Sequence, residues 1–125
     1  VVTYGSDTVP AFWSRRSPHP APLRLDTPEA IARFFETRGA LGLGGGMLVA
    51  NPVPAEDEIP ADEMAGFIAA AQADAEAEAV SGKAVTPFLL ARILELTGGR
   101  SLATNIALVK NNARLAARIA AAQSA

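Results

Sequence analysis

A helical pattern at the end of the chain constrains the fold more than any other feature, because it fixes one long element and its two faces. The pattern runs from Ser101 to about Gln123. At about 100° of turn per residue, Asn105 and Asn112 lie on nearly the same side of the helix. That side also carries an apolar stripe of Leu102, Leu108, Val109, Leu115, Ala116 and Ile119. The opposite side is polar and should face solvent, with Lys110, Asn111, Arg114 and Arg118.

The two asparagines in this stripe are the first candidate functional residues. A buried amide is unfavourable unless it finds hydrogen-bond partners, so each asparagine must contact either the protein or a ligand. Asparagine offers two donor hydrogens and an acceptor oxygen, which can bind a sugar hydroxyl or the edge of a base without titrating. For Asn105, near the helix start, a ligand contact and a structural hydrogen bond are equally open. For Asn112, deeper in the helix, we expect a structural hydrogen bond to a neighbouring loop.

Length and composition exclude several classes of protein. With 125 residues, the chain suits one domain or part of one. The formal net charge is −2 and like charges form no long block, so we expect no nucleic-acid partner. The chain has no cysteine and only one histidine, His19, which excludes disulfides and multi-histidine zinc sites within it and fits a cytoplasmic protein. No run approaches the roughly 18 apolar residues of a membrane span, so we expect no membrane partner.

The first part of the chain predicts two short strands with a proline-rich loop between them. Val1 to Tyr4 is β-branched and aromatic and precedes turn residues, which predicts a strand. A sequence that begins on such a run, without an initiator methionine, suggests a fragment of a longer protein. Between Pro10 and Pro22 the prolines block regular helix, while Phe12 and Trp13 can anchor the segment either as a lid or as a plain surface connection. Leu23 to Leu25 should form the second strand.

One helix and one further strand should follow. The helix signals are a capping residue, a proline in the first turn and closing glycines, namely Asp26 or Thr27, Pro28, and Gly39 with Gly42. Its apolar stripe consists of Ile31, Phe34 and Phe35. The glycines from Gly42 to Gly46 precede an apolar run instead of joining a strand to a helix, so they favour tight turning over phosphate binding. That apolar run, Met47 to Ala50, predicts a buried strand.

Three successive helices complete the pattern. The first should run from Pro60 to about Val80, and the second from Thr86 to the glycines Gly98 and Gly99. Ser101 should cap the third. Strands alternating with helices early in the chain predict an α/β fold, here with a few strands and about four helices. The terminal helices should cover a sheet that needs more strands than this chain provides.

The remaining candidate reactive groups do not form a catalytic set. His19 lies in the proline-rich loop and no G-x-S-x-G motif occurs, which argues against a serine hydrolase. Lys110 belongs to the polar face of the last helix and Lys83 to a Gly-Lys turn, so neither is a strong nucleophile candidate. The acidic residues lack the spacing of a calcium loop and should be solvated, in a cluster of Glu56, Asp57, Glu58, Asp62 and Glu63.

Four stretches together resemble one enzyme family. They read PAFWSRRSPHPAPLRLD, GLGGGMLVANPVP, GKAVTPFLLARILELTGG and SLATNIALVKNNARLAARIA. In this order, and across essentially the whole chain, they are similar to the C-terminal portion of pseudouridine-5'-phosphate glycosidases. The resemblance implies a three-layer α/β/α fold, with residues 1–125 as the C-terminal part of a single domain. It also implies a homotrimeric, cytoplasmic enzyme of nucleotide metabolism.

The resemblance further implies a reaction. Family members use manganese and reversibly cleave the C–C glycosidic bond of pseudouridine 5'-phosphate, giving uracil and ribose 5-phosphate. Their nucleophilic lysine, proton-transferring glutamate and metal-binding aspartate belong to the part upstream of Val1, so no catalytic residue or metal ligand can be placed in this chain. The family's active-site asparagine heads the motif N-I-x-L-V-x-N-N and falls on Asn105, which is expected to orient the substrate or its opened-sugar adduct.

The isolated chain is therefore expected to be inactive, and the complete protein is expected to be the glycosidase. The alternative is a non-catalytic helical binding or assembly module derived from this family. The sequence encoded upstream of Val1 distinguishes the two hypotheses, because only the enzyme needs the missing lysine, glutamate and aspartate.

Overall fold

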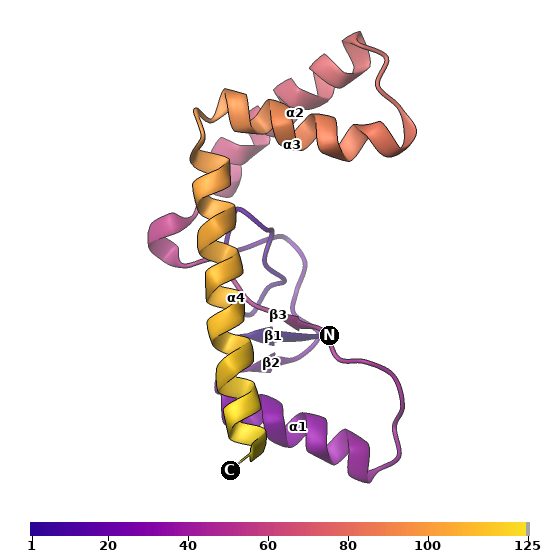
Figure 1. Ribbon diagram of the computed structural model, residues 1–125, viewed down its shortest axis with the longest axis vertical. Helices are drawn as coiled ribbons and strands as arrows, with labels where there is room; N and C mark the ends of the chain where they lie inside the picture. Colours follow the sequence, from indigo (N-terminus) through magenta and orange to yellow (C-terminus); the bar gives the residue numbers. More distant parts are fainter. Residues whose placement is uncertain (125) are drawn as a thin grey trace.

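The sheet of this protein is small and parallel. A computed structural model describes residues 1–124 and shows a mixed α/β fold (Figure 1). Strand β1 (Val2–Tyr4) lies between β2 (Arg24–Leu25) and β3 (Val49–Ala50) and is parallel to both. Thr3 pairs with Arg24 on one side and with Ala50 on the other. The α/β class is therefore confirmed, as are the strands predicted at Val1 to Tyr4 and Leu23 to Leu25.

The third strand differs from its prediction. The sequence predicts a buried strand from Met47 to Ala50, but only Val49–Ala50 forms the strand, both residues are half-buried, and Leu48 is 64% exposed. The reason is that β3 lies at an edge, since within residues 1–124 it pairs only with β1. The glycines before it turn the chain as predicted, because Gly42 and Gly45 adopt φ angles of 69° and 89° that side chains disfavour.

Helix α1 (Pro28–Ala40) begins and ends where the sequence predicts. Thr27 is extended, and its hydroxyl oxygen accepts a hydrogen bond of 3.1 Å from the backbone N–H of Ala30. The predicted apolar stripe is wrong at one position, because Phe35 is 46% exposed. Ile31 is buried as predicted, Ala32 is buried beside it, and α1 packs against the last helix of the chain.

Replacing Thr27 with alanine should lower the free energy of unfolding by about 1 kcal/mol, because the first turn of α1 loses its side-chain acceptor. Urea denaturation followed by circular dichroism measures the loss. Thr37→Ala is the matched control, since Thr37 lies exposed in the same helix and should change stability by no more than about 0.5 kcal/mol. Equal losses in the two variants would contradict a capping role.

The last three helices are α2 (Ala61–Ala77), α3 (Val85–Leu96) and α4 (Arg100–Ser124), with short 3-10 turns at Ala55–Asp57 and Gly82–Ala84. Helices α2 and α3 pack side by side as a hairpin that extends away from the sheet at the top of Figure 1, while α4 runs past the sheet to α1. The expectation that the terminal helices cover a sheet with more strands than this chain provides stays a prediction, since α2 and α3 pack against each other and not on strands β1 to β3 (Figure 1). Within residues 1–124, no helix combines the length and apolarity of a membrane span.

A small core forms where this hairpin meets the proline-rich segment. Its buried residues are Ile59, Met64, Ala71 and Ile93, and Trp13 packs against them. The backbone N–H of Ile59 donates to the carbonyl of Trp13 at 2.9 Å, and the Ser14 hydroxyl donates to the carbonyl of Ile59 at 2.6 Å. The predicted anchoring by Trp13 is confirmed. Phe12 is 44% exposed and touches Trp13 edge to face, with ring centroids 4.8 Å apart.

The junction between α3 and α4 corrects one prediction. The glycines Gly98 and Gly99 end α3 with φ angles of 60° and 88°, as expected. However, α4 begins at Arg100, so Ser101 lies inside the helix and does not cap it. The hydroxyl oxygen of Thr97 accepts from the backbone N–H of Ser101 at 3.1 Å, and therefore satisfies one of the free donors at this helix start.

Candidate functional site

Helix α4 presents a buried face that only partly matches its predicted apolar stripe. Leu108 and Leu115 are buried as expected, but Leu102 and Val109 are 50% and 59% exposed. The hydroxyl residues Ser101 and Thr104 are buried in their place, and the Thr104 hydroxyl donates to the carbonyl of Asp57 at 2.7 Å. This side of α4 is buried because the first half of the helix packs against α3 and against the segment before α2, where Asp57 lies.

Asn105 lies in a groove between the proline-rich segment, α3 and α4. The groove has a volume of about 200 Å³ and is lined mainly by apolar residues, namely Phe12, Trp13, Leu90, Ala91, Leu94, Ser101, Leu102 and Asn105. The asparagine is half-buried, and its side-chain amide makes no hydrogen bond within residues 1–124. An amide with free donors and a free acceptor beside aromatic rings can recognise a planar polar group. Its expected role as a substrate contact stays a prediction.

Two further asparagines of α4 bind the chain that leaves β3. Asn112 accepts a hydrogen bond of 3.1 Å from the side-chain amide of Asn51, which matches the structural hydrogen bond expected for it. Asn111, expected on the solvent side, is instead half-buried and donates to the carbonyl of Pro52 at 3.1 Å. That expectation was wrong because the loop after β3 passes beside α4 and covers the edge of its polar face.

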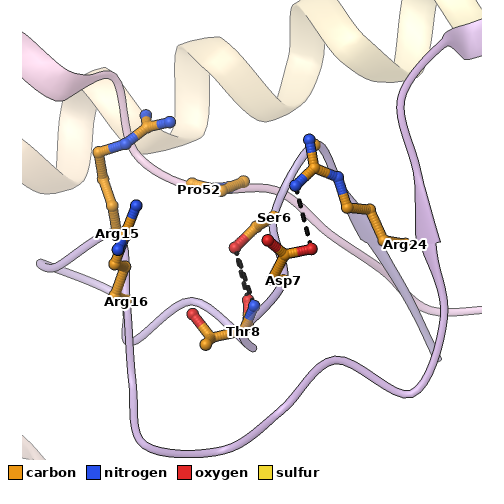
Figure 2. Close-up of a pocket in the computed structure, with 8 residues that line it drawn as sticks. Ser6, Asp7, Thr8, Arg15, Arg16, Arg24 and Pro52 are labelled. Carbon is orange, nitrogen blue, oxygen red and sulfur yellow. Dashed lines mark hydrogen bonds and ion pairs between the residues drawn. The ribbon is translucent and has the colours of Figure 1, made fainter.

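The sequence alone did not reveal a polar cavity at the carboxyl end of β1 (Figure 2). It measures about 150 Å³ and is lined by Gly5, Ser6, Asp7, Thr8, Arg15, Arg16, Arg24 and Pro52. Arg24 forms ion pairs with Asp26 at 2.7 Å and with Asp7 at 3.1 Å. Hydrogen bonds to Asp26 and Asp7 raise the pKa of Arg24 above its ordinary value. Ligands of parallel α/β sheets commonly bind beyond the carboxyl ends of the strands, which makes this cavity a second candidate.

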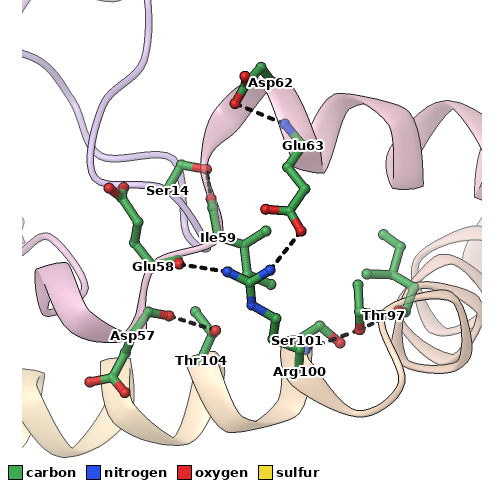
Figure 3. A network of polar contacts seen from close by, with 11 residues as sticks. Ser14, Asp57, Glu58, Ile59, Asp62, Glu63, Thr97, Arg100, Ser101 and Thr104 are labelled. Carbon is green, nitrogen blue, oxygen red and sulfur yellow. Dashed lines mark hydrogen bonds and ion pairs between the residues drawn. The ribbon is translucent and has the colours of Figure 1, made fainter.

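A polar network joins the acidic segment to the start of α4 (Figure 3). Arg100 pairs with Glu63 at 2.6 Å and donates to the carbonyl of Glu58 at 3.4 Å. The Glu58 carboxylate accepts from the backbone N–H of Arg15 at 2.8 Å. The prediction of a solvated acidic cluster is therefore wrong for Glu58, which is half-buried and bonded to the proline-rich segment, whereas Glu63 is exposed as predicted although it pairs with Arg100.

The other candidate reactive residues are not brought together with Asn105. His19, Lys83 and Lys110 are all exposed, and each lies on a different part of the chain. Across residues 1–124, no three His, Cys, Asp or Glu side chains lie close enough together to hold a metal ion. The residues of this chain therefore do not by themselves fit the manganese site that the family resemblance implies.

Comparisons with known proteins identify relatives of this chain. The family model described as Indigoidine synthase A like protein matches residues 1–122. A pseudouridine-5'-phosphate glycosidase of Mesorhizobium japonicum is 73% identical over 98% of this chain and 40% of its own length. One of Methylobacterium nodulans is 69% identical over 98% of this chain and 36% of its own length. The chain thus spans about 40% of the length of the curated relatives it matches.

Two solved structures share the fold. The prealnumycin C-glycosynthase AlnA, in complex with ribulose 5-phosphate, superimposes with a TM-score of 0.85 and 28% identity over 98% of this chain and 40% of its own. An indigoidine synthase A-like protein of Thermotoga maritima gives a TM-score of 0.79 and 36% identity over 95% of this chain and 39% of its own. The family match and these identities show that the chain belongs to the indigoidine synthase A like family, which includes the pseudouridine-5'-phosphate glycosidases.

Proposed function

We propose that the chain is the C-terminal part of a pseudouridine-5'-phosphate glycosidase. The complete enzyme would reversibly cleave the C–C glycosidic bond of pseudouridine 5'-phosphate to uracil and ribose 5-phosphate. The observation that carries this proposal is the 73% identity, over 98% of the chain, to a relative of that name. The fold relative in complex with ribulose 5-phosphate adds support, because it pairs this architecture with a five-carbon sugar phosphate.

The chain would contribute one wall of the active site, with Asn105 as its substrate contact. The free amide can donate to a carbonyl oxygen or accept from an N–H or hydroxyl of the substrate. The apolar groove around it, which includes the ring of Trp13, would exclude water from that hydrogen bond and strengthen it. Asn105 would therefore orient the substrate or the opened-sugar adduct while groups from the remainder of the protein perform the chemistry.

The remainder of the protein would supply the lysine nucleophile, the proton-transferring glutamate and the ligands of manganese. Manganese, when bound there, would polarise a substrate oxygen. We also propose that the complete enzyme is a cytoplasmic homotrimer, as the family resemblance implies.

An Asn105→Ala variant of the complete protein should lower kcat/KM for pseudouridine 5'-phosphate by about tenfold to hundredfold, because a buried substrate group loses its hydrogen-bond partner. Uracil release measures the effect. Asn112→Ala is the matched control: it removes the same group from the same helix, but its partner is Asn51, and it should retain activity within about threefold. Normal turnover and affinity in Asn105→Ala would remove this residue from the site.

A further inference from the structure

We propose that the polar cavity at the carboxyl end of β1 is a binding site for a phosphate group. The inference does not depend on the glycosidase reaction, because it concerns residues that are separate from the Asn105 groove. The cavity is lined by Gly5–Thr8, by three arginines and by Pro52, and it measures about 150 Å³. That volume is below the several hundred Å³ of typical sites for larger ligands, so it fits a compact anion or the phosphate end of a phosphorylated ligand.

The charge of the lining favours an anion. Three guanidinium groups and one carboxylate, that of Asp7, line the cavity, and Asp7 is already paired with Arg24 at 3.1 Å. Arg15 uses one guanidinium nitrogen to donate to the carbonyl of Val53 at 2.6 Å and keeps its other donors. Arg16 forms no ion pair or hydrogen bond within residues 1–124. Adjacent Arg15 and Arg16 therefore offer guanidinium donors whose geometry matches phosphate oxygens.

The loop opposite these arginines carries donors that lack an acceptor. Gly5 adopts a φ of 62°, and the backbone N–H groups of Ser6 and Asp7, which follow it, donate no hydrogen bond within residues 1–124. Successive N–H groups after such a turn form concave anion-binding sites in proteins. The loop is held in place, because the Ser6 hydroxyl donates to the carbonyl of Thr8 at 2.7 Å and the carbonyl of Asp7 accepts from the N–H of Ala21 at 2.8 Å.

Thr8 provides the most specific indication. Its hydroxyl oxygen is buried and has no hydrogen-bond partner, the one such side-chain atom within the described residues. A buried hydroxyl without a partner is unfavourable, and native structures rarely retain one without a reason. Thr8 lines the cavity, and in Figure 2 its side chain extends toward the side where Arg15 and Arg16 lie. An anion bound in this cavity would supply the acceptor that the Thr8 hydroxyl lacks.

The test is an NMR titration of the 15N-labelled 125-residue chain with inorganic phosphate, at constant pH and ionic strength. We expect saturable shifts of the Gly5 to Thr8 amide signals, with a dissociation constant in the millimolar range. Arg16→Gln should weaken phosphate binding about tenfold and Thr8→Val about threefold, because each removes one donor to the anion. Arg114→Gln, the control, removes an exposed guanidinium from α4 outside the cavity and should leave the affinity unchanged.

Further measurements identify the source of the phosphate group and test whether Thr8 binds the anion or only contributes to folding. Competition by ribose 5-phosphate but not by ribose would show that the site accepts a phosphate ester, and binding of inorganic phosphate alone would show that it takes the free ion. Thr8→Val should fold at least as stably as the unchanged chain without phosphate and gain less stability from it. Shifts that do not saturate, equal shifts with chloride, or unchanged affinity in both Arg16→Gln and Thr8→Val would overturn the proposal. Uracil release is not measured, so these outcomes are independent of the enzyme assignment.

Discussion

The purified 125-residue chain should release no detectable uracil from pseudouridine 5'-phosphate, with or without added manganese. Cleavage of a C–C glycosidic bond needs an attacking nucleophile and a proton donor held against the substrate. Lys83 and Lys110 are the only lysines, and both are exposed: Lys83 lies in the turn before α3, and Lys110 lies on α4 but does not line the Asn105 groove. A nucleophilic lysine must be held against the substrate and shielded from water, and neither exposed side chain is placed that way. The expected difference from the complete enzyme is therefore a loss of turnover beyond the range of the assay.

The comparison requires the complete protein as a positive control, assayed at the same concentration by the same measurement of uracil. Adding the separately purified N-terminal portion to the chain provides a second arm. Recovery of turnover on mixing would show that this chain completes a site whose reactive groups lie on the other portion. Robust turnover by the 125-residue chain alone would contradict the assignment of those groups to the upstream part.

Local backbone chemistry made much of the fold predictable. Thr27 followed by Pro28 marks the start of α1, and the paired glycines Gly98 and Gly99 mark the break before α4, because these residues restrict or release φ regardless of what packs nearby. Where an element faces depends instead on its partners. Phe35 and Val109 have the right spacing for a buried stripe and are nevertheless exposed, since the packing partner lies on a different side of the helix.

The two candidate sites also differ in whether local sequence or tertiary packing determines them. Asn105 was singled out from the sequence because an amide in an apolar stripe needs a partner, and the structure places it half-buried in a groove without one within the described residues. The cavity beside β1 could not be found this way. Its residues come from a turn, a proline-rich loop and two other strand ends. None of these residues belongs to a sequence pattern that indicates a binding site. Only the parallel pairing of β1 with β2 and β3 brings them together, and that pairing is a tertiary property.

The core between α2, α3 and the proline-rich segment is small, so each of its residues should carry a large share of the stability. Ile59 has no exposed surface, and it packs in a cluster with Met64, Ala71 and Ile93. Its backbone also bonds to both Trp13 and Ser14, so it lies where three segments of the chain meet. Truncating a fully buried isoleucine removes its apolar contacts and leaves a cavity that its surroundings fill only in part.

Ile59→Ala should therefore lower the free energy of unfolding by about 4 kcal/mol, a large part of the 5–15 kcal/mol that is typical of a domain. Urea denaturation followed by circular dichroism at 222 nm, a wavelength that reports helix, measures the change. Ile106→Ala is the matched control, because Ile106 is 47% exposed on α4 and should lose no more than about 0.5 kcal/mol. A similar loss of unfolding free energy in both variants would contradict this prediction, because the buried Ile59 would then contribute no more to stability than the exposed Ile106.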